Sequence, residues 1–193
     1  MEKAVEISGL SYSYTDGENS LLDINLDIFD GESVGIIGPN GSGKSTLLLN
    51  LDGTLKGEGS IKVFGTIGTV TQEIDGELSV GEKKWGAVEQ ALSSDLAIVC
   101  LDEPTLSLDA KHREEVIELI RERDGTKIIV TQDLDLVFET CSRVILMNAG
   151  EIIREGNTME ILGDKVLLEE NDLEQPERFA QPKIPGFYPL GNN

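Results

Sequence analysis

Apolar and polar side chains alternate near the start of the chain, at residues 4–14 and 21–29. This two-residue period predicts two strands of an antiparallel sheet with one face in solvent. Short apolar runs bounded by turn residues predict further strands. They occupy residues 33–38, 59–65, 66–72, 96–101 and 127–131. The run at 96–101 is apolar on both faces, which favours a central parallel strand.

Helices are predicted where apolar positions follow a longer period or a capping residue precedes them. The segments are 44–51, 79–93, 109–123 and 157–163. Ser79 and Glu82 form a capping box at the start of the second segment. Asp109 is the expected N-cap of the third, and Asn157 or Thr158 is that of the fourth.

The alternation of strands and helices predicts an α/β fold in which helices flank a mostly parallel central sheet. A hairpin is expected at 143–153 with its turn at 148–150, and the proline-containing tail at 175–193 is expected to be extended. Three buried strands end at polar groups: SVGII enters GPNGSGKS, LAIVCL enters DEP and KIIVT enters QD. Because ligands bind beyond the carboxyl ends of parallel strands, these three ends should line one crevice.

The charge balance narrows the range of functions. The 193 residues suffice for one sizeable core, and 36 acidic against 16 basic side chains give a net charge of −20. Such a chain lacks the basic surface that binding to nucleic acids requires. A polyanionic ligand would be repelled by the net negative charge, so it would bind only where a local group of positive charges or N–H donors attracts it. Cys100 and Cys141 lie outside any metal-ligand spacing, which predicts reduced structural thiols. No apolar run reaches membrane-spanning length, and the first residues lack signal-peptide features.

Residues 38–45, GPNGSGKS, match the phosphate-loop pattern G-x-x-x-x-G-K-[ST]. The glycines let successive N–H groups point at phosphate oxygens, and the following helix adds its positive end. Lys44 would contact the β- and γ-phosphates, and the Ser45 hydroxyl would contact Mg²⁺. The pattern lies between a predicted strand and a predicted helix, which is the structural context that a phosphate loop requires. It would therefore be the local site that binds a polyphosphate in this acidic protein.

Two carboxylates, Asp102 and Glu103, follow the apolar run at 96–101. Asp102 suits a water-mediated contact to Mg²⁺, and Glu103 suits a base that polarises an attacking water. Adjacent carboxylates at a strand end are also typical of a solvated turn. The phosphate loop earlier in the chain favours the catalytic interpretation.

The motifs GPNGSGKST, LSVGE and LDEPTLSLD, in this order, resemble those of the ATP-binding cassette (ABC) ATPases. LSVGE, residues 78–82, is similar to the family signature LSGGQ. The resemblance covers roughly residues 5–179, and the segment 143–176 is similar to the cobalt and energy-coupling-factor branch, whose ATPases power uptake of metal ions and vitamins. The resemblance implies a P-loop NTPase core with N-terminal antiparallel strands, ATP and Mg²⁺ as cofactors, and a dimer that holds two nucleotides between protomers.

The resemblance also implies roles for individual residues. Tyr14 matches the aromatic residue that stacks on adenine, although an alternating strand also explains it. Gln72 matches a glutamine that approaches Mg²⁺, and residues 106–109 match the loop that links the two sites of a dimer. Ser79 and Gly81 match residues that reach the γ-phosphate of the other protomer, although capping alone would explain Ser79. The implied cofactor-binding residues are Tyr14, Gly38, Pro39, Asn40, Gly41, Ser42, Gly43, Lys44, Ser45, Thr46, Ser79 and Gly81. The implied metal-binding residues are Ser45, Gln72 and Asp102, and the implied catalytic residues are Glu103, Gln72 and Gln132.

The chain departs from this family at two places. Family members carry a helical subdomain of several dozen residues between the glutamine and the signature, whereas here only residues 73–77 intervene. That subdomain builds the groove for the coupling helices of a membrane partner, so its absence weakens the case for transport coupling. The histidine of the family's T-H-D pattern is replaced by Gln132, which cannot become a cation near neutral pH. The only histidine, His112, is expected on a solvated helix face.

These features predict a reduced ABC-type nucleotide-binding domain at residues 1–163 and an acidic, proline-containing extension at 164–193. The predicted function is Mg-ATP binding and hydrolysis in a cobalt- or vitamin-uptake-like transport system. The alternatives are a degenerate ATP-binding switch with little turnover, and an ABC protein outside transport. The expected partners are a second ABC ATPase chain, identical or different, and an integral membrane subunit, with no nucleic acid. The expected location is the cytoplasm, with peripheral attachment to the inner face of the cell membrane as an option.

Overall fold

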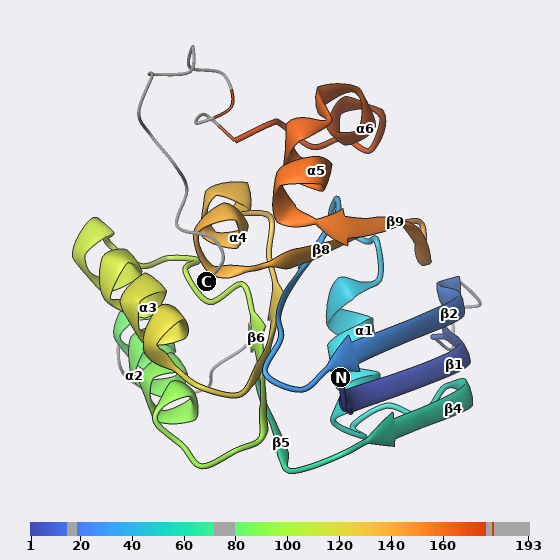
Figure 1. Cartoon of the computed structure of the whole chain (residues 1–193), viewed down its shortest axis with the longest axis horizontal. Coiled ribbons are helices and arrows are strands. Elements are labelled where there is room, and N and C mark those ends of the chain that lie inside the picture. The colour runs from blue at the N-terminus through green and yellow to red at the C-terminus, as the bar shows by residue number, and fades with distance from the viewer. Residues whose placement is uncertain (15–18, 72–79, 177–178, 180–193) are drawn as a thin grey trace.

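The computed structural model describes residues 1–14, 19–71, 80–176 and 179 (Figure 1). A six-stranded sheet lies at the centre, in the order β5-β6-β7-β3-β8-β9. Its strands are β3 Ser33–Ile37, β5 Ile67–Val70, β6 Ile98–Asp102, β7 Thr126–Val130, β8 Arg143–Asn148 and β9 Glu151–Asn157. Only the β8–β9 pair is antiparallel among these described strands, so the predicted mostly parallel sheet is confirmed. The strands β6, β7 and β3 are neighbours, which brings their three polar ends to one edge.

A second, antiparallel sheet has the order β2-β1-β4. Its strands are β1 Lys3–Ser13, β2 Asn19–Phe29 and β4 Glu58–Val63. The alternating apolar side chains of β1 and β2 are buried, and they form one core with α1 (Lys44–Leu51) and one face of the large sheet. The two strands predicted at the start of the chain are therefore confirmed.

Helices cover the other face of the large sheet (Figure 1). They are α2 Val80–Leu92, α3 Ala110–Glu122, α4 Leu134–Thr140, α5 Thr158–Gly163 and α6 Lys165–Glu170. The side chains of β6 alternate between the two cores: Ile98 and Cys100 face α1, whereas Val99 and Leu101 face α2 and α3. This explains why the segment is apolar at every position.

Capping residues define where several helices begin. The side chain of Asp109 accepts a hydrogen bond from the N–H of His112, so the N-cap predicted for α3 is confirmed. The side chain of Asn157 accepts one from the N–H of Met159, so Asn157 rather than Thr158 caps α5. The sequence pattern did not reveal α4 and α6. They contain 7 and 6 residues, too few for an apolar period to stand out, and each is capped by an aspartate. The predicted extension begins with α6, whose Leu168 is buried in the second core, and the boundary at residue 163 stays a prediction.

The connection between β5 and α2 is short. Only residues 71–79 separate the two elements, and 72–79 lie outside the described residues. α2 then packs against α3, β5 and β6. The helical subdomain is thus largely absent, as the sequence predicts. Within the part of the chain that the structure describes, no helix is long and apolar enough to span a membrane.

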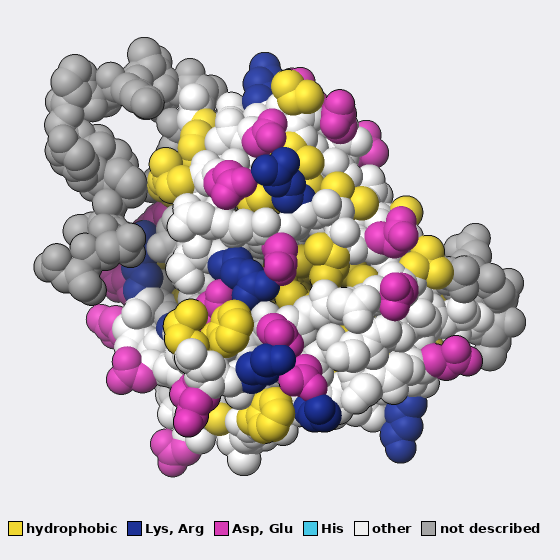
Figure 2. Space-filling model, turned by 45° about the vertical axis from the view of Figure 1, so that its right-hand side comes forward, with side chains coloured by type: hydrophobic (Ala, Val, Ile, Leu, Met, Phe, Trp, Pro, Cys, Tyr) yellow, Lys and Arg dark blue, Asp and Glu magenta, His cyan; other side chains and the backbone are white. Residues whose placement is uncertain are grey.

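The surface carries interspersed charges. On the face shown in Figure 2, Lys and Arg side chains lie among Asp and Glu side chains and form no separate basic area in the coloured part. Ion pairs join neighbouring elements: Lys62 on β4 contacts Glu6 on β1 at 2.6 Å, and Arg154 on β9 contacts Glu160 on α5 at 3.1 Å. These exposed pairs contribute little to stability individually.

Candidate functional site

The phosphate loop, residues 38–45, joins β3 to α1, and its backbone requires glycine at two tightly enclosed positions. Gly38 has φ +151°, and a Cβ built on it would lie 2.0 Å from the carbonyl oxygen of Met147. Gly43, the N-cap of α1, has φ +99°, and its Cβ would lie 2.3 Å from the carbonyl oxygen of Ser20. Any side chain at these positions would displace the loop, so the motif glycines are demanded by the local backbone.

Lys44, the first residue of α1, is buried and folds back over the loop. Its Nζ donates to the carbonyl oxygens of Gly38 at 2.8 Å and Pro39 at 2.9 Å, and to Ser42 Oγ at 3.3 Å. Burial lowers the pKa of Lys44, and the nearby Glu103 and Asp102 partly offset this effect. The ammonium group therefore lies in the loop, where carbonyl oxygens hold it in place and its positive charge is available to bind an anion.

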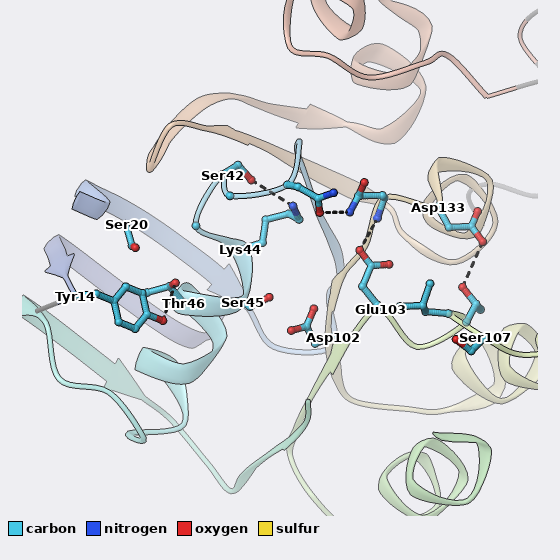
Figure 3. A pocket seen from close by; sticks show the side chains of 16 residues that line it. Tyr14, Ser20, Ser42, Lys44, Ser45, Thr46, Asp102, Glu103, Ser107 and Asp133 are labelled. Carbon is cyan, nitrogen blue, oxygen red and sulfur yellow. Dashed lines mark hydrogen bonds between the residues drawn. The ribbon is translucent and has the colours of Figure 1, made fainter. Parts of the chain in front are cut away.

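Two carboxylates face this lysine across a cavity of about 590 Å³ (Figure 3). Asp102 is the last residue of β6, and Glu103 follows it. Burial raises the pKa of Asp102, while hydrogen bonding to Ser45 and the charges of Lys84 and Lys44 lower it. The predicted gathering of the phosphate loop and the two acids at one edge of the sheet is what the structure shows.

The environment of Asp102 fits a bound cation. Its Oδ1 atom is buried and has no hydrogen-bond partner among the residues that the structure describes. Leaving a buried carboxylate oxygen unpaired is costly. The hydroxyl of Ser45 lies close enough to share a hydrogen bond with the same carboxylate. A carboxylate and a hydroxyl form the oxygen donor set that Mg²⁺ takes beside a polyphosphate, so the residues present fit this ion.

Glu103 is held in a defined orientation. The hydroxyl of Thr131 donates to its Oε2 at 2.8 Å, and the backbone N–H of Gln132 donates to its Oε1 at 3.1 Å. Its φ of +49° is unusual for a residue with a side chain. Burial raises the pKa of Glu103, and the hydrogen bond from Thr131 opposes this shift. A carboxylate with a raised pKa near a phosphate site is suited to accept a proton from water.

The end of β7 links the acids to the loop. The side-chain amide of Gln132 donates to Asn40 Oδ1 at 2.7 Å, which joins the position of the family's histidine to the phosphate loop. Asp133 caps α4 and accepts three charged hydrogen bonds from Arg113 on α3, from Nε at 3.2 Å and from Nη2 at 3.1 and 3.3 Å. Arg113 thus fixes the segment that carries Gln132.

Tyr14 lies at the other end of the cavity (Figure 3). Its hydroxyl is 3.3 Å from Thr46 Oγ1, and its ring contacts the ring of Tyr12 edge to face with centroids 5.0 Å apart. The ring remains 41% exposed. An exposed aromatic face beside a phosphate loop leaves room for a nucleobase to stack, and this role of Tyr14 stays a prediction.

The signature residues are only partly placed. Gln72 and Ser79 lie outside the described residues. Gly81, in the first turn of α2, is close to the loop at 106–109, since a Cβ on it would lie 2.9 Å from the carbonyl oxygen of Ser107. Ser107 itself lines the cavity. The described part of the signature therefore lies beside the rim of the same cavity.

Several other residues take no part in the cavity. Burial raises the pKa of Cys100 to about 12 and that of Cys141 to about 11, as expected of structural thiols. His112 is less solvated than predicted, because its ring packs 5.5 Å from that of Trp85 and its Nδ1 lies 2.9 Å from Asp109. The indole of Trp85 accordingly packs between α2 and α3.

The sequence analysis missed the residues that support the carboxylates, namely Lys84, Thr131 and Arg113. Lys84 is buried, and its Nζ donates to the main chain at the ends of β5 and β6. A signal for it existed, because Lys84, Val88 and Leu92 recur every four residues along the buried face of α2. A lysine in an otherwise apolar stripe indicates a charge that points inward.

Comparisons with known proteins find similar chains. A sequence profile described as ABC transporter matches residues 21–69. A Gloeobacter violaceus protein, provisionally named ABC transporter ATP-binding protein, is 33% identical, with 91% of this chain and 98% of that protein covered. The energy-coupling factor transporter ATP-binding protein EcfA of Methanothermobacter thermautotrophicus is 30% identical, with 89% and 76% covered. Among solved structures, CbiO1 of Clostridium perfringens, part of the ABC transporter complex CbiONQ, has a TM-score of 0.67 and 25% identity, with 93% and 98% covered.

The lengths in these comparisons bear on the short connection before α2. The alignment with the Gloeobacter protein has 239 positions, whereas this chain has 193 residues. Several dozen positions are therefore occupied by the relative alone. The profile match, in turn, ends at residue 69, within β5 and before the short connection to α2.

Proposed function

This chain belongs to the family of ABC transporter ATP-binding proteins, and from that premise we propose that it binds Mg-ATP in the cavity between the phosphate loop and Glu103 and hydrolyses it. One observation carries the proposal. A single cavity of about 590 Å³ has Lys44 and the loop amides on one side and Asp102 and Glu103 on the other. This arrangement combines an anion site, a cation site and a base within reach of one ligand.

In this proposal the phosphate chain lies in the loop, where the backbone N–H groups and the start of α1 stabilise its negative charge. The Nζ of Lys44 exchanges its bonds to the carbonyl oxygens of Gly38 and Pro39 for phosphate oxygens. Ser45 and Asp102 would hold Mg²⁺, and the bound ion would neutralise phosphate charge. Glu103 accepts a proton from the attacking water, and Gln132 and Gln72 position the water and the terminal phosphate.

The remaining assignments follow family membership. Tyr14 stacks on the base, and Ser79 and Gly81 approach the γ-phosphate held by a second chain. The position of Ser107 at the cavity rim beside Gly81 supports a dimer in which the rims of two chains meet.

A role in transport is supported by the relatives. EcfA carries the name of an energy-coupling factor transporter, and CbiO1 is part of the complex CbiONQ. We therefore propose that this chain works at the cytoplasmic face of the membrane with an integral membrane subunit, in the uptake of a metal ion or a vitamin. Because the helical subdomain is largely absent, the membrane subunit would contact the core directly. Co-purification of the full chain with its membrane subunit tests this part.

The enzymatic part is tested with two variants. Lys44→Ala should weaken Mg-ATP binding at least about a hundredfold in calorimetry, because it removes the charge inside the loop. Lys56→Ala, which makes the same charge change at an exposed position, serves as the control. Glu103→Gln should leave binding nearly unchanged and should lower single-turnover phosphate release by about a hundredfold or more.

The outcomes separate the candidate functions. If ATP binds to both wild type and Glu103→Gln and neither releases phosphate above background, hydrolysis is rejected and the alternative of an ATP-binding switch is supported. Unchanged affinity in Lys44→Ala would remove the phosphate loop from the proposal altogether.

A further inference from the structure

Lys84 is a buried cation that has no role in the proposed function. It lies on α2, four residues after the start of the helix, and its side chain is buried. Its Nζ donates to the carbonyl oxygen of Asp102 at 2.6 Å and to that of Thr71 at 3.1 Å. The ammonium group therefore connects the signature helix with the carboxyl ends of both β5 and β6.

The bond to Asp102 acts on one particular peptide group, the one between Asp102 and Glu103. Its carbonyl oxygen accepts from Lys84, and its N–H donates to the carbonyl oxygen of Val130 on β7 at 2.8 Å. The peptide is thus held from opposite sides by α2 and β7. Rotation of this peptide would redirect both carboxylates, because each side chain is attached to one of its two ends.

This peptide also precedes a strained residue. Glu103 has φ +49°, a left-handed conformation that is unfavourable for a residue with a Cβ and persists only where the surroundings enforce it. The bonds from Lys84 and to Val130 on the preceding peptide, together with the bond from Thr131 to the side chain, supply that enforcement.

The charge of Lys84 is costly in this place. Burial lowers the pKa of Lys84, and the attractive charges are first Asp102 and then Glu103. An apolar side chain of similar length would fill the same space of α2 without this cost. What the lysine adds is a donor for two main-chain oxygens and a positive charge that favours the ionised form of Asp102.

We propose that Lys84 is a positioning residue that holds the peptide between Asp102 and Glu103, and thereby makes the signature helix part of the support for the magnesium-binding side of the site. This inference rests on the proposed function, because it assumes that Asp102 helps to hold Mg²⁺. It adds a residue of α2, outside the cavity lining, to the determinants of nucleotide binding. In a chain without most of the helical subdomain, this bond ties α2 directly to the core.

The test is the magnesium dependence of ATP binding, measured by calorimetry on the full chain with Mg²⁺ and with EDTA. The ratio of the two affinities reports the contribution of the cation, separately from any hydrolysis. Lys84→Met should lower this ratio by at least about tenfold while the affinity for magnesium-free ATP changes less than about threefold. Lys83→Met, the same charge change at the neighbouring position of α2, should leave the ratio within about threefold of wild type, and Lys84→Arg should restore most of it.

Each outcome decides the proposal. A ratio in Lys84→Met equal to that in Lys83→Met would overturn it, while wild-type binding of Mg-ATP would still support the proposed function. If Lys84→Met does not fold, as judged by circular dichroism, Lys84→Gln replaces it, and its ratio should fall by at least about fivefold. An unchanged ratio in Lys84→Gln would equally overturn the role. A wild-type chain that binds no ATP would reject the proposed function and the role of Lys84 together.

Discussion

The cavity has two walls that are built differently. The phosphate-loop wall, residues 38–46, is one continuous stretch that runs from the end of β3 into the first turn of α1. The carboxylate wall consists of Asp102 and Glu103 at the end of β6, with supports from β7 and α2. The first wall depends on a backbone conformation that only glycine tolerates at two points, whereas the second depends on hydrogen bonds between distant segments. A substitution at one of these two glycines should therefore abolish ligand binding, whereas the loss of one hydrogen bond in the second wall should only weaken the site.

The largest effect is expected from Gly43→Ala in the phosphate-loop wall. The residue has φ +99°, and the added Cβ would approach the carbonyl oxygen of Ser20 to 2.3 Å. We expect the free energy of unfolding to fall by at least about 2 kcal/mol and ATP binding to become undetectable. Urea unfolding and calorimetry measure the two quantities.

Gly86→Ala is the matched control for this prediction. Gly86 lies on the exposed side of α2, and apart from the backbone of its own helix no atom of the described residues lies within 4 Å of a Cβ built on it. Alanine in a helix interior stabilises by about 0.5–1 kcal/mol relative to glycine, so this variant should gain stability and bind ATP normally. Comparable losses in the two variants would contradict the proposed difference between the walls.

A smaller effect is expected from Thr131→Val in the carboxylate wall. The change keeps the shape of the side chain and removes the hydrogen bond to Glu103 Oε2. Single-turnover phosphate release should fall by about tenfold, since the base loses one of its two orienting bonds. The free energy of unfolding should fall by about 1–2 kcal/mol, because the hydroxyl also accepts from the N–H of Asp133.

Thr158→Val serves as the control for Thr131→Val. The hydroxyl of Thr158 is also buried, and it donates to the carbonyl oxygen of Cys141 at 2.7 Å, away from the cavity. This variant should lose similar stability and keep its rate of phosphate release. Equal rates in the two valine variants would show that the bond from Thr131 does not orient the base.

The smallest effect is expected from Gln132→His, which restores the residue type of the wider family. An imidazole with a pKa near about 6.5 is charged below that pH and neutral above it. At pH 6 the imidazolium would place a positive charge beside the terminal phosphate. The ratio of the Mg-ATP affinity at pH 6 to that at pH 8 should therefore be a few times larger for the variant than for wild type. Affinities measured across this range provide the test, and parallel profiles for the two proteins would place residue 132 away from the phosphate.

More of the phosphate-loop wall than of the carboxylate wall could be predicted from the sequence. The phosphate loop, its flanking strand and its helix were predicted together, because the pattern is contiguous and each residue acts through its immediate neighbours. Asp102 and Glu103 were identified from their place after an apolar run. The bonds from Lys84 and Thr131 were not foreseen, since they join residues far apart in sequence: Lys84 contacts Asp102 across 18 positions, and Thr131 contacts Glu103 across 28.

The sequence by itself determined the strands and the helices other than α4 and α6, where the phosphate loop lies, and that the connection before α2 is short. These properties are set by short-range periodicity, by the backbone freedom of glycine and by spacing along the chain. Only the tertiary structure decided that a lysine of α2 holds the peptide behind the two carboxylates, and that Gln132 contacts Asn40. Such contacts depend on the order of strands in the sheet and on which helix face turns inward, and neither follows from local pattern alone.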